Sequence, residues 1–173
     1  MKAVIVSDSH GRFGGIQEII ERELPFDLFL HAGDIQGGSG CIEDWAGCPV
    51  YVVKGNCDWS GDYPREVIVP FGSHRIFLTH GHRYAVKVEI ETLARTAKDR
   101  GADIAVHGHS HIPAVNERYG VITLCPGSVT EPRQQNRRPT YLVLETVPGK
   151  GLSWEIKYLQ CGVPGKIIFG DRV

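Results

Sequence analysis

The first ten residues constrain the fold of this chain more than any other stretch. Residues 3–6 are apolar and mostly β-branched, which predicts a short strand buried on both faces. Asp8 and His10 follow this strand directly. Because side chains two positions apart in extended backbone point to the same side, this carboxylate and this imidazole are expected to reach one cation. A buried strand that ends in metal-capable side chains indicates an α/β sheet with a site at its carboxyl edge.

The same arrangement recurs four more times along the chain. Each time, polar residues follow directly on an apolar run that predicts a strand. Successive clusters begin 26, 22, 24 and 29 residues apart, at Asp8, Asp34, Asn56, His80 and His109. Each interval is long enough for one crossover connection and one strand. Because right-handed crossovers bring the carboxyl ends of strands to one edge of a sheet, we expect five loops to converge on that edge.

Each cluster also has an ordinary explanation when it is taken alone. Asp34 is a suitable helix cap, and residues 56–58 form a suitable turn. Histidines at 107, 109 and 111 suit a solvated tract, and a lone histidine at position 80 suits a satisfied core residue. These explanations would all have to hold together, each at a strand end, so one shared site is the favoured interpretation. Glycines beside four of the clusters, at 33, 55, 81 and 108, would let the backbone segments approach closely.

The segments between the clusters predict the other elements. Apolar residues at helical spacing predict helices at 14–24, with Leu24 on the apolar face, and at 86–100, whereas 37–40 predict a flexible loop. Further strands are expected at 27–31, 50–53, 65–70, 75–79 and 104–106. The last four strands are expected at 114–118, 121–124, 141–146 and 152–159. With no helix between them, they predict an antiparallel sheet wrapped on the α/β half.

Composition narrows the class of protein and its surroundings. A chain of 173 residues is expected to form one domain, 1–173, of the α/β (α+β) class. A net charge of −1 without a basic stripe disfavours nucleic acid as a partner, and no apolar run approaches a membrane span. Five cysteines without a Cys-x-x-Cys pair, and an N-terminus without a signal peptide, predict free thiols and a cytoplasmic location. A disulfide between Cys41 and Cys48 is the less favoured alternative.

The five clusters together carry a family resemblance. The signature of the calcineurin-like metallophosphoesterases resembles five motifs of this sequence: Asp8-x-His10, Gly33-Asp34, Gly55-Asn56, His80-Gly81-His82 and Gly108-His109-x-His111. Within that superfamily the chain resembles the small bacterial and archaeal phosphodiesterase branch, from residue 4 to about residue 128. The resemblance implies the calcineurin-like phosphoesterase fold, a four-layer α/β/β/α sandwich with two mixed β-sheets.

The resemblance also implies a binuclear metal centre with two divalent ions per chain. One ion would be held by Asp8, His10, Asp34 and His111, and the other by Asp34, Asn56, His80 and His109, with Asp34 bridging. Mixed oxygen and nitrogen ligands suit manganese, the favoured ion, with iron, zinc, nickel and magnesium as alternatives. A hydroxide that bridges the two ions is then the expected nucleophile at phosphorus.

The catalytic candidates implied beside the ligands are Asn56, Cys57, Asp58 and His82. Larger members of the superfamily have a histidine at the position of Cys57, and that histidine is thought to protonate the leaving group, whereas the small branch shares the cysteine. A thiol, with an ordinary pKa of about 8.5, is a poorer general acid than an imidazole. His82 is the alternative proton donor, or a residue that only supports the ligands.

These observations predict a metal-dependent hydrolase, a phosphodiesterase acting on small or nucleotide-like phosphodiesters. Two alternatives stay open: a nuclease, which the near-neutral charge disfavours, and a non-catalytic metal-binding scaffold, the use to which a retromer-coat subunit has put this fold. Arg133, Arg137 and Arg138 are candidate contacts for a substrate phosphate, although a solvated loop is the favoured interpretation. The oligomeric state also stays open, a homodimer included.

Overall fold

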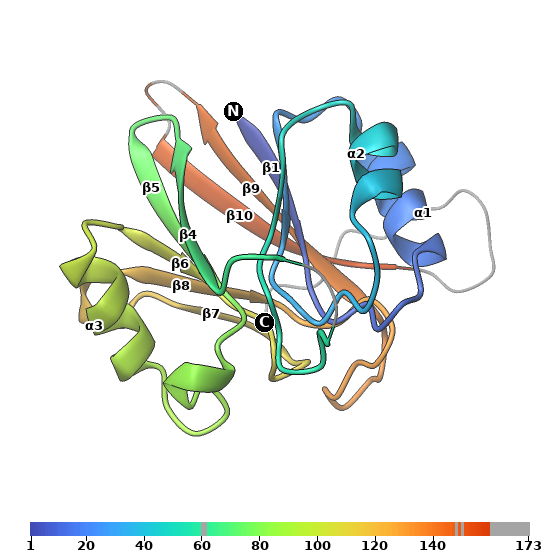
Figure 1. Cartoon of the computed structure of the whole chain (residues 1–173). Coiled ribbons are helices and arrows are strands. Elements are labelled where there is room, and N and C mark those ends of the chain that lie inside the picture. The colour runs from blue at the N-terminus through green and yellow to red at the C-terminus, as the bar shows by residue number, and fades with distance from the viewer. Residues whose placement is uncertain (60–61, 148, 150, 160–173) are drawn as a thin grey trace.

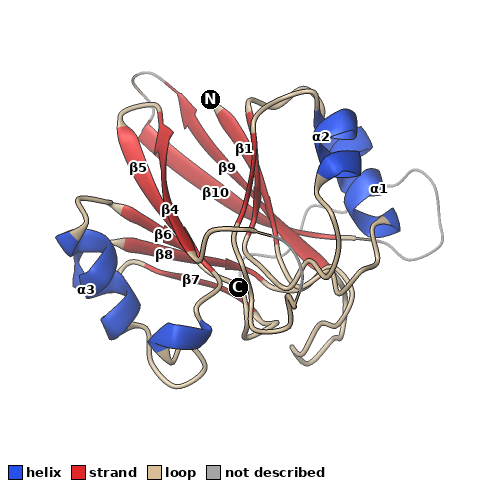
Figure 2. Cartoon of the chain, in the orientation of Figure 1, coloured by secondary structure: helices blue, strands red, loops and turns tan. Residues whose placement is uncertain are grey.

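Two five-stranded β-sheets lie face to face in this protein, with helices on their outer faces (Figure 1). The computed structural model describes residues 1–59, 62–147, 149 and 151–159. Helices α1 (Gly14–Glu23) and α2 (Gly40–Ala46) cover one sheet, and helix α3 (Glu91–Asp99) covers the other, as Figure 2 shows. The layers therefore follow the order α/β/β/α, which confirms the predicted four-layer sandwich.

The first sheet has the strand order β10-β9-β1-β2-β3. Its strands are β1 (Lys2–Val6), β2 (Leu28–His31), β3 (Val50–Val52), β9 (Thr140–Val147) and β10 (Gly151–Tyr158). β1, β2 and β3 run parallel, whereas β9 is antiparallel to both β1 and β10. Crossovers through α1 and α2 connect the parallel strands, so the carboxyl ends of β1, β2 and β3 lie at one edge.

The second sheet has the strand order β4-β5-β6-β8-β7. Its strands are β4 (Glu66–Phe71), β5 (His74–Thr79), β6 (Ile104–Val106), β7 (Pro113–Asn116) and β8 (Ile122–Pro126). β5, β6 and β8 run parallel, and the edge strands β4 and β7 run antiparallel to their neighbours. Two short 3₁₀ helices, η1 (His82–Tyr84) and η2 (Arg118–Gly120), lie in the connections. Both sheets are therefore mixed, as predicted.

The main core lies between the two sheets, whose inner faces are apolar. Ile5 of β1 packs there with Leu30 and Leu78, all without exposed surface. The alternate residues of β1, Val4 and Val6, belong instead to a second core beneath α1 and α2. β1 is therefore buried on both faces, as its unbroken apolar run predicts.

The predicted C-terminal antiparallel sheet is wrong. The last four strands are divided between the two sheets, because β7 and β8 complete the second and β9 and β10 complete the first. β8 pairs in parallel with β6, and β9 pairs with β1. These pairings satisfy the backbone hydrogen-bonding groups at the open edges of β1 and β6, which a separate sheet would leave without strand partners.

Helix α3 is shorter than the sequence predicts, because it begins at Glu91 rather than at residue 86. Ala85 has a left-handed backbone conformation (φ 53°), which an α-helix does not accommodate. The side chain of Glu89 then accepts a hydrogen bond from the N–H of Thr92 (3.1 Å) and satisfies one of the free donors at the helix start. The apolar residues Val86 and Ile90 pack on the outer core from a non-helical segment, so their spacing only imitates a helix.

Helices α1 and α2 also depart from the sequence-based expectation. Leu24, expected on the apolar face of α1, is 47% exposed, while Glu23 is buried in its place. The sequence does not predict α2, which begins next to the expected flexible loop. Its seven residues form too few turns to show a helical period, and it ends at Gly47 in the left-handed conformation (φ 60°) that commonly stops helices.

Two further sequence-based predictions concern the membrane and the thiols. Across the described ranges, every helix falls short of the length and apolar character needed to cross a membrane. Cys41, Cys48, Cys57 and Cys125 are free thiols, so the alternative disulfide between residues 41 and 48 is not formed. Cys161 lies outside the described residues.

Candidate functional site

The loops that follow five strands meet at one end of the two sheets (Figure 1). Those after β1, β2 and β3 come from the first sheet, and those after β5 and β6 come from the second. The expected convergence is observed, but the expected single sheet edge is wrong, because two facing sheets each contribute an edge. Together these loops carry all seven predicted ligand residues: Asp8, His10, Asp34, Asn56, His80, His109 and His111.

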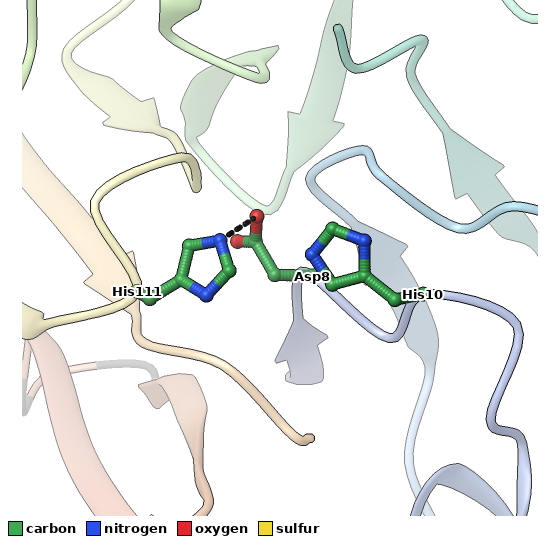
Figure 3. Close-up of side chains that lie close together, drawn as sticks. All are labelled: Asp8, His10 and His111. Atoms are coloured by element: carbon green, nitrogen blue, oxygen red, sulfur yellow. Dashed lines mark ion pairs between the residues drawn. The ribbon is translucent and has the colours of Figure 1, made fainter. Parts of the chain in front are cut away.

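Asp8, His10 and His111 form one side of the site (Figure 3). The Asp8 carboxylate lies between the two imidazole rings, with its Oδ1 3.1 Å from Nε2 of His111. The rings of His10 and His111 stack with their centroids 5.4 Å apart. Nδ1 of His111 donates a hydrogen bond to the carbonyl of Glu131 (2.7 Å), and this contact orients the ring so that Nε2 faces Asp8.

Asp34, Asn56, His80 and His109 form the other side. Nε2 of His80 lies 3.3 Å from Oδ2 of Asp34 and 3.1 Å from Oδ1 of Asn56. The ring of His109 lies 5.2 Å from the ring of His80, measured between centroids. The two sides are joined by the backbone N–H of His109, which donates to Oδ2 of Asp8 (3.2 Å). The structure therefore brings the predicted ligands of both ions into one continuous cluster.

Potential ligand atoms approach one another closely in three groups of residues. Within each group, one ligand atom of every residue lies within 4.8 Å of the others. The groups are Asp8–His10–His111, His10–Asp34–Cys57 and Asp8–Asp34–His80. Asp8, His10 and Asp34 each belong to two of them, and Asp34 is only 2% exposed. The Asp34 carboxylate therefore lies near potential ligands from both sides of the site, His10 and His80.

Five of the seven predicted ligands have left-handed backbone conformations, with φ between 46° and 65°: Asp8, His10, Asp34, His109 and His111. Residues other than glycine seldom adopt this region, although Asp and His do so more readily than most. Such a conformation has an energetic cost, persists only where the surrounding structure fixes it, and concentrates at functional sites. The backbone thus marks the same residues as the sequence motifs do.

Two glycines let the loops approach as closely as they do. A Cβ atom on Gly55 would lie 2.0 Å from Oδ1 of Asp34. A Cβ atom on Gly108 would lie 1.9 Å from Oγ of Ser7 and 2.7 Å from Oδ2 of Asp8. No side chain fits at such distances, so the predicted role of these glycines in close backbone approach is confirmed.

Asp58 fixes the loop that carries Asp34. Its Oδ2 accepts hydrogen bonds from the backbone N–H groups of Asp34 (2.9 Å) and Gly55 (2.8 Å). Its Oδ1 accepts a third from the N–H of Gln36 (2.7 Å), and the residue is 4% exposed. Both carboxylate oxygens are therefore engaged by backbone, and this geometry gives Asp58 a positioning role.

Cys57 and His82, the candidates for proton transfer, both lie beside predicted ligands. The backbone N–H of Cys57 donates to Oδ1 of Asp34 (2.7 Å). Burial, followed by the nearby charge of Asp34, raises the pKa of the Cys57 thiol to about 11. The ring of His82 lies 5.4 Å from that of His80, and burial together with His80 lowers the pKa of His82. At neutral pH the thiol therefore keeps its proton, and the His82 imidazole is neutral.

Sequence reasoning missed several residues that hold the ligands from behind. The hydroxyls of Ser128 and Thr130 each donate to the backbone carbonyl of Asp8, both at 2.9 Å. His31, at the end of β2, is fully buried and pairs through Nε2 with Oγ of Ser9 (3.0 Å). Of these residues, only Ser128 lies in a segment, the Pro126-Gly127-Ser128 turn, that resembles the small phosphodiesterase branch. A hydroxyl or histidine at the end of an apolar run was too common a feature to single out the others.

The central carboxylates are held ionised by the imidazoles. Burial alone would raise their pKa values, but His80 lowers the pKa of Asp34, and His111 lowers that of Asp8. The same contacts raise the pKa values of His80 and His111 against the effect of burial. Burial lowers the pKa of His109 to about 4, so its ring is neutral near pH 7. Divalent cations bind ionised carboxylates and neutral imidazoles, so a bound cation would displace the protons that the carboxylates favour on His80 and His111.

Three buried polar atoms at the site have no hydrogen-bond partner among the described residues: Oδ1 of Asp8, Nε2 of His10 and Nδ1 of His82. Leaving such atoms without a partner costs free energy, so each requires an explanation. A divalent cation in the Asp8–His10–His111 group would coordinate the first two. The carboxylate, amide and imidazole donors around it suit the same ion. The residues present therefore fit a metal centre.

Comparison with known proteins identifies one family model and similar bacterial and archaeal proteins. The model of the calcineurin-like phosphoesterase superfamily domain matches residues 1–149. The probable metallophosphoesterase YsnB of Bacillus subtilis (strain 168) is 37% identical over 147 residues, which are 83% of each chain. A probable metallophosphoesterase of Methanothermobacter thermautotrophicus is 32% identical over 165 residues, 92% of each chain.

Solved structures with the same fold confirm the predicted architecture. A Streptococcus pneumoniae TIGR4 protein, described as a predicted phosphoesterase, gives a TM-score of 0.78 at 28% identity and covers 91% of this chain and 88% of its own. Vps29 of Entamoeba histolytica, complexed with Zn²⁺, gives a TM-score of 0.78 at 24% identity. The likeness covers 94% of this chain and 95% of Vps29. An archaeal phosphodiesterase gives a TM-score of 0.73 at 21% identity, and the likeness covers 92% of this chain and 100% of that protein. At these lower identities the last two likenesses show the fold alone.

Proposed function

This chain belongs to the calcineurin-like phosphoesterase superfamily, and on that premise we propose that it is a phosphodiesterase that hydrolyses small or nucleotide-like phosphodiesters. The superfamily implies the use of divalent metal ions. One observation carries the proposal: five loops from two sheets surround the buried Asp34 with oxygen and nitrogen donors, and two of these donor atoms, Oδ1 of Asp8 and Nε2 of His10, have no hydrogen-bond partner among the described residues.

The proposed cofactor is a pair of divalent ions, with manganese favoured. Asp8, His10 and His111 would hold one ion, while Asn56, His80 and His109 would hold the other, and Asp34 would be shared. Such ions, when bound, neutralise charge on a phosphoryl group and activate water for attack on phosphorus. The donor types and the central place of Asp34 support this assignment.

The residues of the chain supply position rather than a nucleophile. Asp58 fixes the Asp34 loop through three backbone N–H groups, and Ser128 and Thr130 fix the backbone of Asp8. The Cys57 thiol, with its pKa raised to about 11, stays protonated at neutral pH and is a poor nucleophile. We therefore infer direct attack by water, without a covalent enzyme intermediate.

The charges around the site favour a diester over a monoester. A monoester dianion carries more negative charge and calls for cationic donors beyond the metal ions. Arg12 is the nearest arginine in sequence to the first motif, and its guanidinium is paired with Glu131, Nη2 to Oε1 at 3.3 Å. Lys54 and Arg83 are the other cations within or directly after the motifs, whereas Lys87 and Arg133 line the pocket beside the loop of His109 and His111. The motifs themselves therefore supply little positive charge and suit the smaller charge of a diester.

The test compares a bis(aryl) phosphate with the matching aryl monophosphate under several added metals. We expect kcat/KM for the diester to be higher by at least about tenfold, or about 1.4 kcal/mol of barrier. Removal of metal by a chelator should abolish both activities, and readdition should restore them. Equal or higher efficiency on the monoester with every metal would overturn the diester proposal.

The same preparation decides between the proposal and its two alternatives. Absence of turnover despite bound metal would favour a non-catalytic scaffold. Salt-sensitive binding and cleavage of single-stranded DNA would favour a nuclease, because contacts to a polymeric phosphate backbone weaken as salt is raised. The net charge of −1 supports a small substrate rather than polymeric nucleic acid.

A further inference from the structure

A pocket of about 510 Å³, which we call the β7 pocket, lies next to the ligand loops but outside the predicted ligand set. Its walls come from the segment before α3, from the loop after β6, and from β7 with β8 beside it. Its lining includes Val86, Lys87, His107, Ser110, Ala114 and Arg133. Its volume falls within the range of about 300–1,000 Å³ typical of sites for small organic ligands.

The β7 pocket adjoins the candidate metal site through one loop. His107 and Ser110 line the pocket, while His109 and His111 of the same loop belong to the predicted ligands. The backbone N–H of Arg133, on the pocket wall, donates to the carbonyl of His111 (3.0 Å). The loop from His107 to His111 is therefore shared by the pocket and the candidate metal site.

His107 gives the pocket a hydrogen-bond acceptor. The residue is only 4% exposed, and its Nδ1 donates a hydrogen bond to the backbone carbonyl of Gly108 (2.9 Å). Since a carbonyl only accepts, the proton of a neutral ring sits on Nδ1 and Nε2 is left as an acceptor. Nε2 makes no hydrogen bond within the described residues and is not one of their fully buried unpaired atoms, so it is open to an N–H or O–H donor of a ligand.

Two exposed cations lie on the wall of the pocket. Lys87 and Arg133 form no ion pair with any of the residues that the structure describes. Arg133 follows the loop that supports Asp8, and its backbone N–H bonds the carbonyl of His111, so it lies where the pocket meets the metal site. The charge of the two cations suits an anionic group.

We propose that the β7 pocket binds the leaving-group side of the diester: an organic group of nucleoside size that offers an N–H or O–H to His107 and carries a second negative charge between Lys87 and Arg133. The apolar side chains of Val86, Ile90 and Ile112 cover the body of that group. This inference rests on the proposed phosphodiesterase function, and it adds a substrate class, a nucleoside with a further phosphate, that the metal ligands alone do not select.

The experiment measures binding, independently of turnover, by calorimetric titration of the manganese-loaded protein. Adenosine 3′,5′-bisphosphate, AMP and inorganic phosphate are the probes. The bisphosphate should bind at least about tenfold more tightly than AMP, since only it can place one phosphate at the metal site and one between the two cations. Inorganic phosphate should bind most weakly, because it leaves the pocket empty.

Two variants and their matched controls locate the effect. Ala114→Trp, on the exposed edge strand β7, fills the pocket and should weaken bisphosphate binding by at least about tenfold while leaving inorganic phosphate unchanged. Val88→Trp is the control, because Val88 is 86% exposed and does not line the pocket. Lys87→Gln should weaken bisphosphate binding by about two- to fivefold, and Lys98→Gln on α3 should not change it.

The outcomes separate this inference from the proposed function. Equal bisphosphate affinity in the wild-type protein and in both pocket variants would overturn the inference, and diester turnover would still stand if it is observed. Pocket-dependent binding without turnover would support the pocket as a nucleotide site and overturn the proposed hydrolysis. If Ala114→Trp lowers the melting temperature markedly, Lys87→Gln, which changes an exposed side chain, still decides the question.

Discussion

Two buried carboxylate clusters in this protein are built in opposite ways. Glu23, at the end of α1, has its partners within the fold: Nζ of Lys2 lies 2.9 Å from Oε2, and Nζ of Lys157 lies 2.9 Å from Oε1. The hydroxyl of Tyr141 also donates to Oε1 (2.7 Å). Asp34 is equally buried, but its side chain faces histidines and other potential ligands rather than lysines.

The difference lies in what each cluster leaves unsatisfied. Around Asp34, Oδ1 of Asp8 and Nε2 of His10 have no hydrogen-bond partner within the described residues, whereas both oxygens of Glu23 are paired. The backbone at Asp8 and His10 is also in the costly left-handed region. A buried charge with complete internal partners stabilises the fold, while a buried cluster with open donor atoms and a strained backbone is built for a ligand. Variants in each cluster test this distinction.

The largest expected effect is that of Asp34→Asn on activity. Loss of the shared carboxylate should lower kcat/KM for the diester by at least about 10³-fold, or roughly 4 kcal/mol, and reduce the metal bound per chain. The variant also removes the carboxylate partner of the buried His80, so we expect some loss of folding stability in the metal-free protein, and turnover is therefore compared per folded molecule. Steady-state kinetics, metal analysis and urea unfolding measure the three quantities.

Asp103→Asn is the matched control for Asp34→Asn. Asp103 is also a carboxylate paired with a histidine, His74, but it lies at the surface after α3, outside the ligand loops. It should keep both turnover and metal content. If Asp34→Asn keeps wild-type turnover and wild-type metal content, the cluster around Asp34 is not a functional metal site.

The next largest effect is that of Glu23→Gln on stability. The variant leaves two lysines without their carboxylate partner, and removing one member of a buried charge cluster is strongly destabilising. Because the side chains of Lys2 and Lys157 are 24% and 25% exposed, water compensates part of this loss, and we expect about 2 kcal/mol in urea unfolding. Turnover per folded molecule should stay the same. A loss of kcat comparable to that of Asp34→Asn would show that the clusters do not divide into structure and function.

Cys57 tests the boundary between the two kinds of contact, since its backbone holds Asp34 while its side chain faces the ligands. If leaving-group protonation limits turnover, Cys57→His should raise the rate on diesters with poor leaving groups by roughly tenfold and barely change that on aryl diesters. The thiol, with its pKa raised to about 11, is too weak an acid to serve this purpose well. An equal change for both kinds of ester would identify Cys57 as a packing residue only.

Local sequence pattern was sufficient where strands and motifs are continuous. The apolar run of β1 predicts its burial on both faces, and the clusters at Asp8, Asp34 and His80 predict which loops meet. It was insufficient where the outcome depends on distant segments. Whether β8 and β9 form their own sheet or complete existing ones depends on the open edges of β6 and β1, which no local pattern encodes.

The same limit applies to single residues. Glu23 replaces Leu24 on the buried side of α1 because its partners, Lys2 and Lys157, lie 21 and 134 residues away in the sequence. Thr130 supports Asp8 through a contact to a backbone carbonyl, 122 residues away, and such a contact leaves no motif. Residues that would contact a ligand follow recognisable spacings, whereas those that hold them do not.

The smallest expected effect concerns the pH dependence of the stability that Glu23 contributes. Burial opposes ionisation of Glu23, but Lys2, Lys157 and Tyr141 outweigh it and lower its pKa below the ordinary value of 4.5. An acid whose pKa is lower in the folded state stabilises the fold fully above its unfolded pKa and loses this contribution as pH falls through the folded pKa. The difference in unfolding free energy between the wild-type protein and Glu23→Gln should therefore be constant near pH 7 and shrink below about 4.5. Both proteins keep Asp8 and Asp34, so the protonation of the metal site cancels in this difference when metal is absent. Urea unfolding at several pH values measures it, and a difference that stays constant, or grows, well below that pH would show that the ionised form of Glu23 does not stabilise the fold.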